Sequence, residues 1–300
     1  MPCFRPLTAY KVAGGVSFSE GAESGFGAFP LRLPCGRCVG CRLERSRQWA
    51  VRCMHERQMH GLNCAITLTY SDDHLPGPSL VYDDFQRFLK RLRKRISPVK
   101  IRYFGCGEYG ERRGRPHFHA ILFGMDFLDK KPMKDTSAGS KQWSSALLEE
   151  VWGLGRCTVG ECSFETAAYI ARYCLDKVTG PMAEAHYRRV DEETGEITQL
   201  EPEFNFMSLK PGIGASWLDR FGATDVFPFD RVVSRGHEAK PPRYYDKRLS
   251  QVDPERWKEV RYTREERAFE FLKDSTPDRL AVRETVATAN VKRFARGLKK

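Results

Sequence analysis

The chain has 300 residues, of which 41% are apolar, enough for the core of one large domain or two small ones. It carries 50 Lys and Arg against 39 Asp and Glu, a formal net charge of +11 that favours a polyanionic partner such as nucleic acid. No apolar run is long enough to span a bilayer and the N-terminus lacks the apolar region of a signal peptide, so we expect a soluble, intracellular protein without a membrane partner.

Cysteines mark the first part of the chain. Residues 1–34 are rich in Gly and Ser and predict irregular structure, and "PCGRCVGC" then places three cysteines at two-residue gaps: Cys35, Cys38 and Cys41. Disulfides are rare in reducing compartments, and three thiolates need a fourth ligand to complete a tetrahedral zinc site. Cys3 is the first candidate for that ligand, ahead of Cys53 and His55. The alternatives are an iron–sulfur cluster and three free buried thiols. Four other cysteines show no such pattern and are expected in the core: Cys106, Cys157, Cys162 and Cys174.

Helical and extended patterns then follow one another. We expect a helix over about 42–61, a strand over 64–70, an amphipathic helix over 83–96, and strands over 100–107 and 116–123. A short charged turn joins the last two strands, which are therefore antiparallel.

The helix over 83–96 has an apolar face and a strongly basic one. Between Arg87 and Lys100 there are seven basic residues and no acid, whereas an ordinary solvated face mixes the two signs. This composition favours a contact surface for a phosphate backbone at least as strongly as a plain solvated face. The DNA-binding residues predicted here are Arg87, Lys90, Arg91, Arg93, Lys94 and Arg95.

Two histidines stand at the start of an apolar run in "GRPHFHAILFG". On a strand, His117 and His119 point to the same face, and Phe118 points to the other. Glu108 ends the preceding strand, so an antiparallel hairpin brings it level with the histidines; Glu111, in the turn, is a weaker candidate. Two imidazoles and a carboxylate suit Mg²⁺ or Mn²⁺ acting on phosphate oxygens, and they would also bind Zn²⁺ or Fe²⁺. The alternative is a pair of surface histidines without a ligand.

Two tyrosines lie one helical turn apart in "YIARYCLDK". Tyr169 and Tyr173 share a face of the helix expected over 166–178, with Lys177 one turn further along. Such pairs often serve packing alone. In a functional site, a tyrosine oxygen acts as a nucleophile, and Arg172 or Lys177 stabilises its phenolate.

The remaining segments complete the organisation of the chain. A short helix over 144–152 and a strand over 156–164 precede the tyrosine helix, residues 181–245 appear as loops, and two charged helices broken at Pro277 follow Asp253. The antiparallel hairpin favours an α+β fold over a doubly wound one. We expect three parts: 1–60, an arm with the cysteines and a helix; 61–180, the core; and 181–300, a loop-rich extension with charged helices.

The order of these motifs resembles a known family. "CAITLTY", "GRPHFHAILFG" and "YIARYCLDK" resemble motifs one to three of the HUH-type rolling-circle replication initiators, in their two-tyrosine subclass. Together with the cysteine block and "RLERSRQWAVRCMHE", they are most similar to the initiators of the gokushovirus branch of the Microviridae. The similarity covers about 35–180 well and the remainder loosely.

This resemblance implies a fold and a reaction. The fold is a mainly antiparallel sheet of about five strands with flanking helices, in which His117, His119 and Glu108 bind a catalytic Mg²⁺ or Mn²⁺. Tyr169 and Tyr173 are the implied nucleophiles. Relatives often have Lys where this chain has Arg172, so charge stabilisation of phosphate is retained there but proton transfer is not.

The implied function is nicking and rejoining of phage origin DNA. Tyrosine attack would leave a 5′-phosphotyrosine and a free 3′-hydroxyl for a host DNA polymerase, on single-stranded or replicative-form phage DNA in the bacterial cytoplasm. No G-x-x-x-x-G-K-[ST] motif occurs, so a helicase would also come from the host. Two alternatives remain open: an HUH transposase or relaxase, and a non-enzymatic nucleic-acid-binding protein stabilised by zinc.

Overall fold

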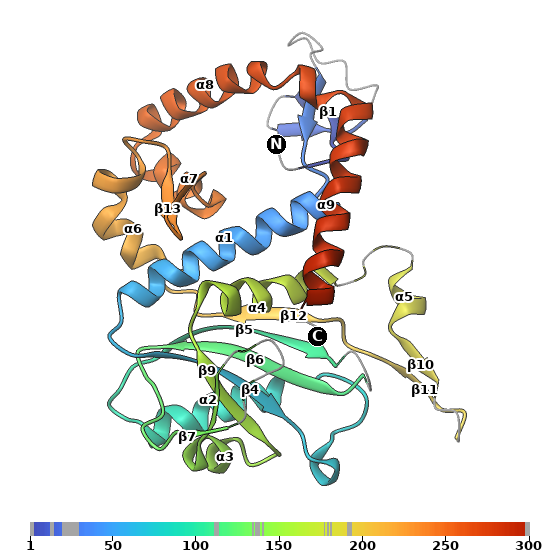
Figure 1. Cartoon of the computed structure of the whole chain (residues 1–300), viewed down its shortest axis with the longest axis vertical. Coiled ribbons are helices and arrows are strands. Elements are labelled where there is room, and N and C mark those ends of the chain that lie inside the picture. The colour runs from blue at the N-terminus through green and yellow to red at the C-terminus, as the bar shows by residue number, and fades with distance from the viewer. Residues whose placement is uncertain are drawn as a thin grey trace. The chain divides into compact units, whose positions relative to one another are not determined.

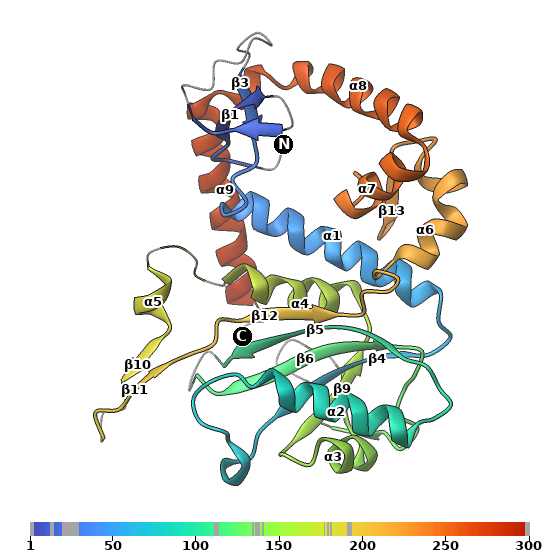
Figure 2. The same ribbon diagram turned by 180° about the vertical axis from the view of Figure 1, so that it is seen from behind.

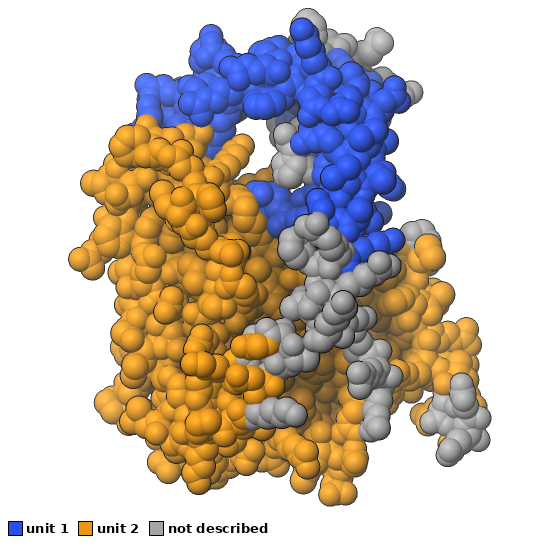
Figure 3. Space-filling model, in the orientation of Figure 1, with its two compact units in different colours: residues 1–45, 253–300 blue, residues 46–252 orange. Residues whose placement is uncertain are grey.

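The computed structural model describes residues 3–12, 15–19, 30–110, 114–133, 135, 139, 141–176, 178, 180, 182–190 and 194–297, without the side chains of 173–176 and 293–297. The chain forms two compact units, which we call unit 1 (1–45 with 253–300) and unit 2 (46–252) (Figure 3). These boundaries differ from the divisions at 60 and 180 expected from the sequence.

Unit 2 is built on one large antiparallel sheet (Figure 1). Among the described residues it has seven strands in the order β12-β5-β6-β4-β9-β8-β7, and each neighbouring pair is antiparallel. The α+β class is confirmed, and the expected count of five strands is corrected to seven. The strand bounds are β4 Asn63–Thr69, β5 Arg102–Tyr109, β6 Pro116–Phe123, β7 Lys131–Pro132, β8 Gln142–Ser144, β9 Cys157–Glu161 and β12 Phe204–Met207.

Helices cover both faces of this sheet (Figures 1 and 2). Their bounds are α1 Val39–Gln58, α2 Tyr82–Arg95, α3 Ala146–Trp152 and α4 Phe164–Asp176. Because side chains alternate along β6, Phe118 and Leu122 enter a core with α2 and α3. Ile121 and Phe123 enter a second core with α1 and α4. His117 and His119 lie four and two positions before Ile121, so their side chains point to the same face of the sheet as Ile121, the face that α4 covers.

Local chemistry sets the ends of the helices. The Ser145 hydroxyl accepts a hydrogen bond from the Leu148 N–H and caps the start of α3, and Gly153 ends it in the left-handed conformation (φ 66°). α2 begins with acidic residues and ends with basic ones, which complements the helix dipole.

The described residues between 182 and 245 contain more regular structure than the sequence suggests. β12 pairs with β5 as the edge strand of the main sheet, about a hundred residues away in sequence. The Phe206 ring of β12 packs against Phe85 and Phe118. The same ring also lies over Gly105 of β5, so that a Cβ atom at position 105 would be only 2.5 Å from it. A glycine is therefore needed at that point of β5.

The rest of unit 2 packs partly on α1. Trp217 and Tyr245 form a core with Val51 of α1. The remaining elements of this unit are η1 Asp72–His74, α5 Ala183–His186, β10 Arg188–Val190, β11 Ile197–Gln199, α6 Ala215–Phe221, the π-helical turn η2 Gly222–Val226, β13 Val232–Ser234, β14 His237–Ala239 and α7 Arg243–Val252.

Unit 1 joins both ends of the chain. Its small sheet has the order β2-β1-β3, and the two charged helices expected after Asp253 are present, the second beginning at Pro277. An Arg5–Glu284 ion pair of 2.8 Å links the N-terminal arm to the last helix. Within the part of the chain described, no helix has the length and apolar character to cross a membrane. The elements are β1 Leu7–Val12, β2 Gly15–Ser17, β3 Pro30–Leu33, α8 Pro254–Glu270, η3 Lys273–Ser275 and α9 Pro277–Gly297.

Candidate metal and nucleophile site

The register of the β5–β6 hairpin places three potential metal ligands side by side. Glu108 lies directly opposite His117, and Cys106 lies opposite His119. Alternation then sends Glu108 and both histidines to the α4 face of the sheet. The structure thus brings together the residues that the sequence analysis proposed as ligands.

The three side chains converge on one point. The Nε2 atoms of His117 and His119 lie 2.7 Å and 3.1 Å from Glu108 Oε1, and potential ligand atoms of all three lie within 4.8 Å of one another. The Glu108 side chain is 3% exposed, whereas each histidine side chain is 15% exposed. The carboxylate therefore forms the floor of the site, and the imidazoles border its open side.

Hydrogen bonds on the far side of each imidazole fix its orientation. His117 Nδ1 donates to the Arg115 carbonyl at 3.1 Å, and His119 Nδ1 lies 2.9 Å from the Thr67 hydroxyl. With the proton on Nδ1, both Nε2 atoms are available as ligands. Thr67 is not among the residues predicted from the sequence. The β4–β6 register pairs it with His119, and only the fold reveals that pairing.

Electrostatics couple Glu108 to the histidines. Burial raises the pKa of Glu108, but the hydrogen bonds and charge of the two imidazoles outweigh it and hold the pKa below its usual range. Burial lowers the pKa of His117, whereas its hydrogen bond to Glu108 and the charge of that carboxylate produce a net rise. The site therefore attracts positive charge.

A divalent cation fits this donor set. Glu108 Oε2 is buried and has no hydrogen-bond partner among the described residues, an arrangement that is costly unless another group completes it. Two neutral imidazole nitrogens and a carboxylate, with an open side, are a common ligand set for such ions. Because both histidine side chains are partly exposed, the site can be reached from solvent.

Tyr169 approaches the histidines from α4. Small buried residues, Ala167 and Ala171, let the helix lie close to the sheet. The Tyr169 ring then meets the His119 ring edge-on, with centroids 5.5 Å apart, and remains 39% exposed. Tyr169 is therefore a neighbour of the candidate metal ligands.

The other residues predicted around the tyrosine are less fully defined. Arg172 lies on α4 and is exposed. The Tyr173 backbone belongs to α4, but its side chain lies outside the described part of the chain, as do Lys177 and Glu111 as a whole. Their roles stay predictions.

The basic helix lies away from this site. α2 packs on the sheet face opposite to the histidines. Arg91 also donates to the carbonyls of Val151 and Trp152, both at 2.8 Å, and so closes the end of α3. The sequence predicts that six basic residues of α2 contact DNA: Arg87, Lys90, Arg91, Arg93, Lys94 and Arg95. This stays a prediction, and the surface it concerns is separate from the histidine site.

The cysteines of the N-terminal part form a second cluster, in unit 1. Cys35, Cys38 and Cys41 are joined there by Cys3. Neither Cys53 nor His55 belongs to this group. Cys106, Cys157 and Cys162 are buried in unit 2, as expected for core thiols, and the Cys174 side chain lies outside the described residues.

Fold and site together define an α+β protein with a two-histidine, one-carboxylate candidate site for a divalent cation and a tyrosine beside it. Residues 63–178 match the family model of the replication-associated protein ORF2/G2P. This span contains all the site residues described in unit 2.

Curated relatives extend the similarity over most of the chain. The replication-associated protein VP4 of Bdellovibrio phage phiMH2K is 30% identical over 86% of this chain and 80% of its own length. The replication-associated protein ORF2 of Spiroplasma virus 4 is 31% identical, over 83% of this chain and 80% of that protein. The replication-associated protein ORF4 of Chlamydia phage 1 is 34% identical, over 72% of this chain and 53% of that protein. No solved structure matches. The chain belongs to this family of phage replication-associated proteins.

Proposed function

We propose that the chain initiates phage DNA replication by nicking and rejoining origin DNA through attack by a tyrosine. The observation that carries this proposal is the convergence of His117, His119 and Glu108, with the Tyr169 ring in contact with that of His119. The names of the relatives support a replication role over that of a transposase or relaxase.

The residues of the site have distinct roles in this proposal. His117, His119 and Glu108 would hold Mg²⁺ or Mn²⁺, which as a Lewis acid withdraws charge from a non-bridging oxygen of the scissile phosphate. Thr67 and the Arg115 carbonyl orient the two imidazoles so that both Nε2 atoms point toward Glu108, where the ion would be held. Arg172 adds a permanent positive charge on the tyrosine helix, which favours an anionic phosphate nearby.

The chemical step is a transesterification. The tyrosine oxygen loses its proton and attacks phosphorus in line, forming a phosphotyrosine bond as the bond from phosphorus to the 3′ oxygen breaks. The 3′ oxygen takes up a proton and becomes the primer for a host DNA polymerase, while a host helicase opens the duplex. The reverse attack by a 3′-hydroxyl rejoins the strand without ATP because the covalent link conserves the phosphodiester.

Two tyrosines allow a repeated cycle. Tyr169 and Tyr173 are one turn apart on α4, so each in turn is expected to reach the same phosphate. One holds the 5′ end after the first nick, and the other cuts the regenerated origin. The released 3′-hydroxyl then closes a unit-length circle.

The test uses the full chain and single-stranded oligonucleotides tiled across the phage genome, with Mg²⁺ or Mn²⁺, analysed on a denaturing protein gel. The wild type should form a covalent protein–DNA band. Tyr169→Phe and Tyr173→Phe should each retain some adduct but fail at repeated rounds, and the double variant and His119→Ala should form none. Tyr262→Phe, at an exposed tyrosine of α8, is the matched control and should behave as wild type.

Two results would contradict the proposal. An adduct from the double tyrosine variant would place the nucleophile elsewhere. A wild type that binds the oligonucleotides but forms no adduct with either ion would instead support a non-enzymatic DNA-binding protein.

A further inference from the structure

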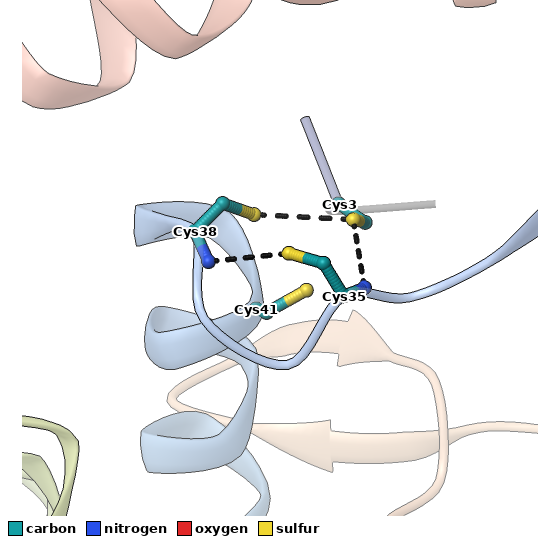
Figure 4. Close-up of side chains that lie close together, drawn as sticks. All are labelled: Cys3, Cys35, Cys38 and Cys41. Carbon is teal, nitrogen blue, oxygen red and sulfur yellow. Dashed lines mark hydrogen bonds between the residues drawn. The ribbon is translucent and has the colours of Figure 1, made fainter. Parts of the chain in front are cut away.

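Four cysteine sulfurs converge in unit 1 (Figure 4). The Sγ atoms of Cys3, Cys35, Cys38 and Cys41 all lie within 4.8 Å of one another, and those of Cys3 and Cys38 are 3.9 Å apart. A tetrahedral Zn²⁺ with Zn–S bonds of about 2.3 Å requires sulfur–sulfur distances of about 3.8 Å. The cysteines are free thiols, and the sulfurs are spaced for one shared ion.

Backbone N–H groups point at these sulfurs. Cys35 Sγ accepts from the amides of Arg37 and Cys38, at 3.5 Å and 3.3 Å, because Gly36 adopts a φ of 76° and turns the loop back on itself. Two further bonds of 3.3 Å join the arm and the loop: Phe4 N to Cys38 Sγ and Cys35 N to Cys3 Sγ. In a metal site, hydrogen bonds of this kind hold the ligand sulfurs in a fixed orientation toward the ion.

Two arginine side chains lie near the cluster. Four thiolates and one Zn²⁺ carry a net charge of −2, which neighbouring cations stabilise. The Arg45 guanidinium lies 3.9 Å from the position that a Cβ atom on Gly36 would occupy. Arg5 is close enough for its charge to interact with Cys35 and Cys38.

Unit 1 has little else to hold its N-terminal sheet. The buried apolar side chains among its described residues are Cys3, Ala9, Cys38, Val260 and Leu280. Two of these belong to the cysteine cluster itself, and Leu7 and Leu31 of the sheet are exposed. A unit with so small a core commonly depends on a metal or a disulfide for its stability.

We propose that Cys3, Cys35, Cys38 and Cys41 bind one structural Zn²⁺. This ion would connect the residues before β1 and after β3, the two ends of the segment that forms the small sheet, to the start of α1. Cys3 precedes β1 and Cys35 follows β3, whereas Cys38 directly precedes α1 and Cys41 lies in its first turn (Figure 4). A four-iron cluster fits less well because its thiolates bind different irons and must spread more widely than around one ion. The inference is independent of the proposed nicking activity, which uses residues of unit 2.

The test measures the metal content of the full-length His119→Ala variant, in which the unit 2 site cannot contribute a tightly bound ion. We expect one zinc per chain that survives dialysis. Cys38→Ser and Cys3→Ser in this background should lower zinc toward zero. Cys157→Ser, which alters a buried cysteine of β9 outside the cluster, should leave it unchanged.

Two further measurements do not depend on the folding of a variant. Replacing zinc with Co²⁺ in the otherwise wild-type chain should give the absorption bands of tetrahedral cobalt bound by thiolates. Stripping the metal with an organomercurial and a chelator should increase proteolysis within residues 1–34. Three results would overturn the proposal. The first is purified protein that contains no metal, and the second is iron found together with inorganic sulfide. The third is zinc that both cysteine variants retain.

Discussion

Thr67 offers the sharpest test of the metal site, because its only predicted role is to orient a ligand. Its hydroxyl lies 2.9 Å from His119 Nδ1. Thr67→Val keeps the branched shape of the side chain and removes this oxygen. The His119 ring then loses the hydrogen-bond partner of its Nδ1 atom, which orients Nε2 toward Glu108.

The expected loss follows from the hydrogen bond. Removing a partner of this kind behind a metal-bound histidine typically weakens metal binding by about 10- to 100-fold, or about 1.4–2.7 kcal/mol. His117 and Glu108 remain in place, so binding is weakened and not abolished. At saturating Mn²⁺, formation of the covalent adduct should therefore recover toward the wild-type rate.

The assay is a Mn²⁺ titration followed in two ways: by the resonance signal of free Mn²⁺ and by adduct formation. Thr69→Val is the matched control. Thr69 lies on the same face of β4, but its hydroxyl donates to the Arg156 carbonyl at 2.7 Å. Unchanged Mn²⁺ affinity in Thr67→Val, or an equal loss in Thr69→Val, would refute the orienting role.

Four more predictions concern charged or titratable groups. Glu108→Gln should lower the pKa of His117, because it removes the carboxylate that raises it; an NMR titration of the metal-free protein that shows no fall would contradict this. Burial lowers the pKa of His55 to about 4, so the unfolded chain binds its proton first, and stability should fall by about 3 kcal/mol as pH drops from 6.5 to 4. Urea unfolding should show this slope, and His55→Gln should flatten it. If α2 contacts DNA, Lys94→Gln with Arg95→Gln should lower the salt dependence of binding by about one unit of slope per lost contact. Arg91→Gln should mainly cost stability, about 1–3 kcal/mol, because it leaves the α3 carbonyls without their donor.

The local patterns of the sequence determine much of the site. Strand alternation is enough to put His117 and His119 on one face, and helical periodicity is enough to define the apolar and basic sides of α2. The two-residue gaps of Cys35, Cys38 and Cys41 indicate a shared ligand. Each of these inferences depends on neighbours within a few residues, whose geometry the backbone conformation fixes directly.

Only the tertiary structure decides which distant segments meet. Whether Thr67 stands behind His119, and whether Cys3 completes the cysteine cluster, depends on register and chain path, which no local period encodes. The same limit hid β12, a strand of four residues that can be recognised only once its pairing with β5 is known. Periodicity likewise reveals that α2 is amphipathic but not which face of the sheet it covers, because that choice is made by the packing of the whole core.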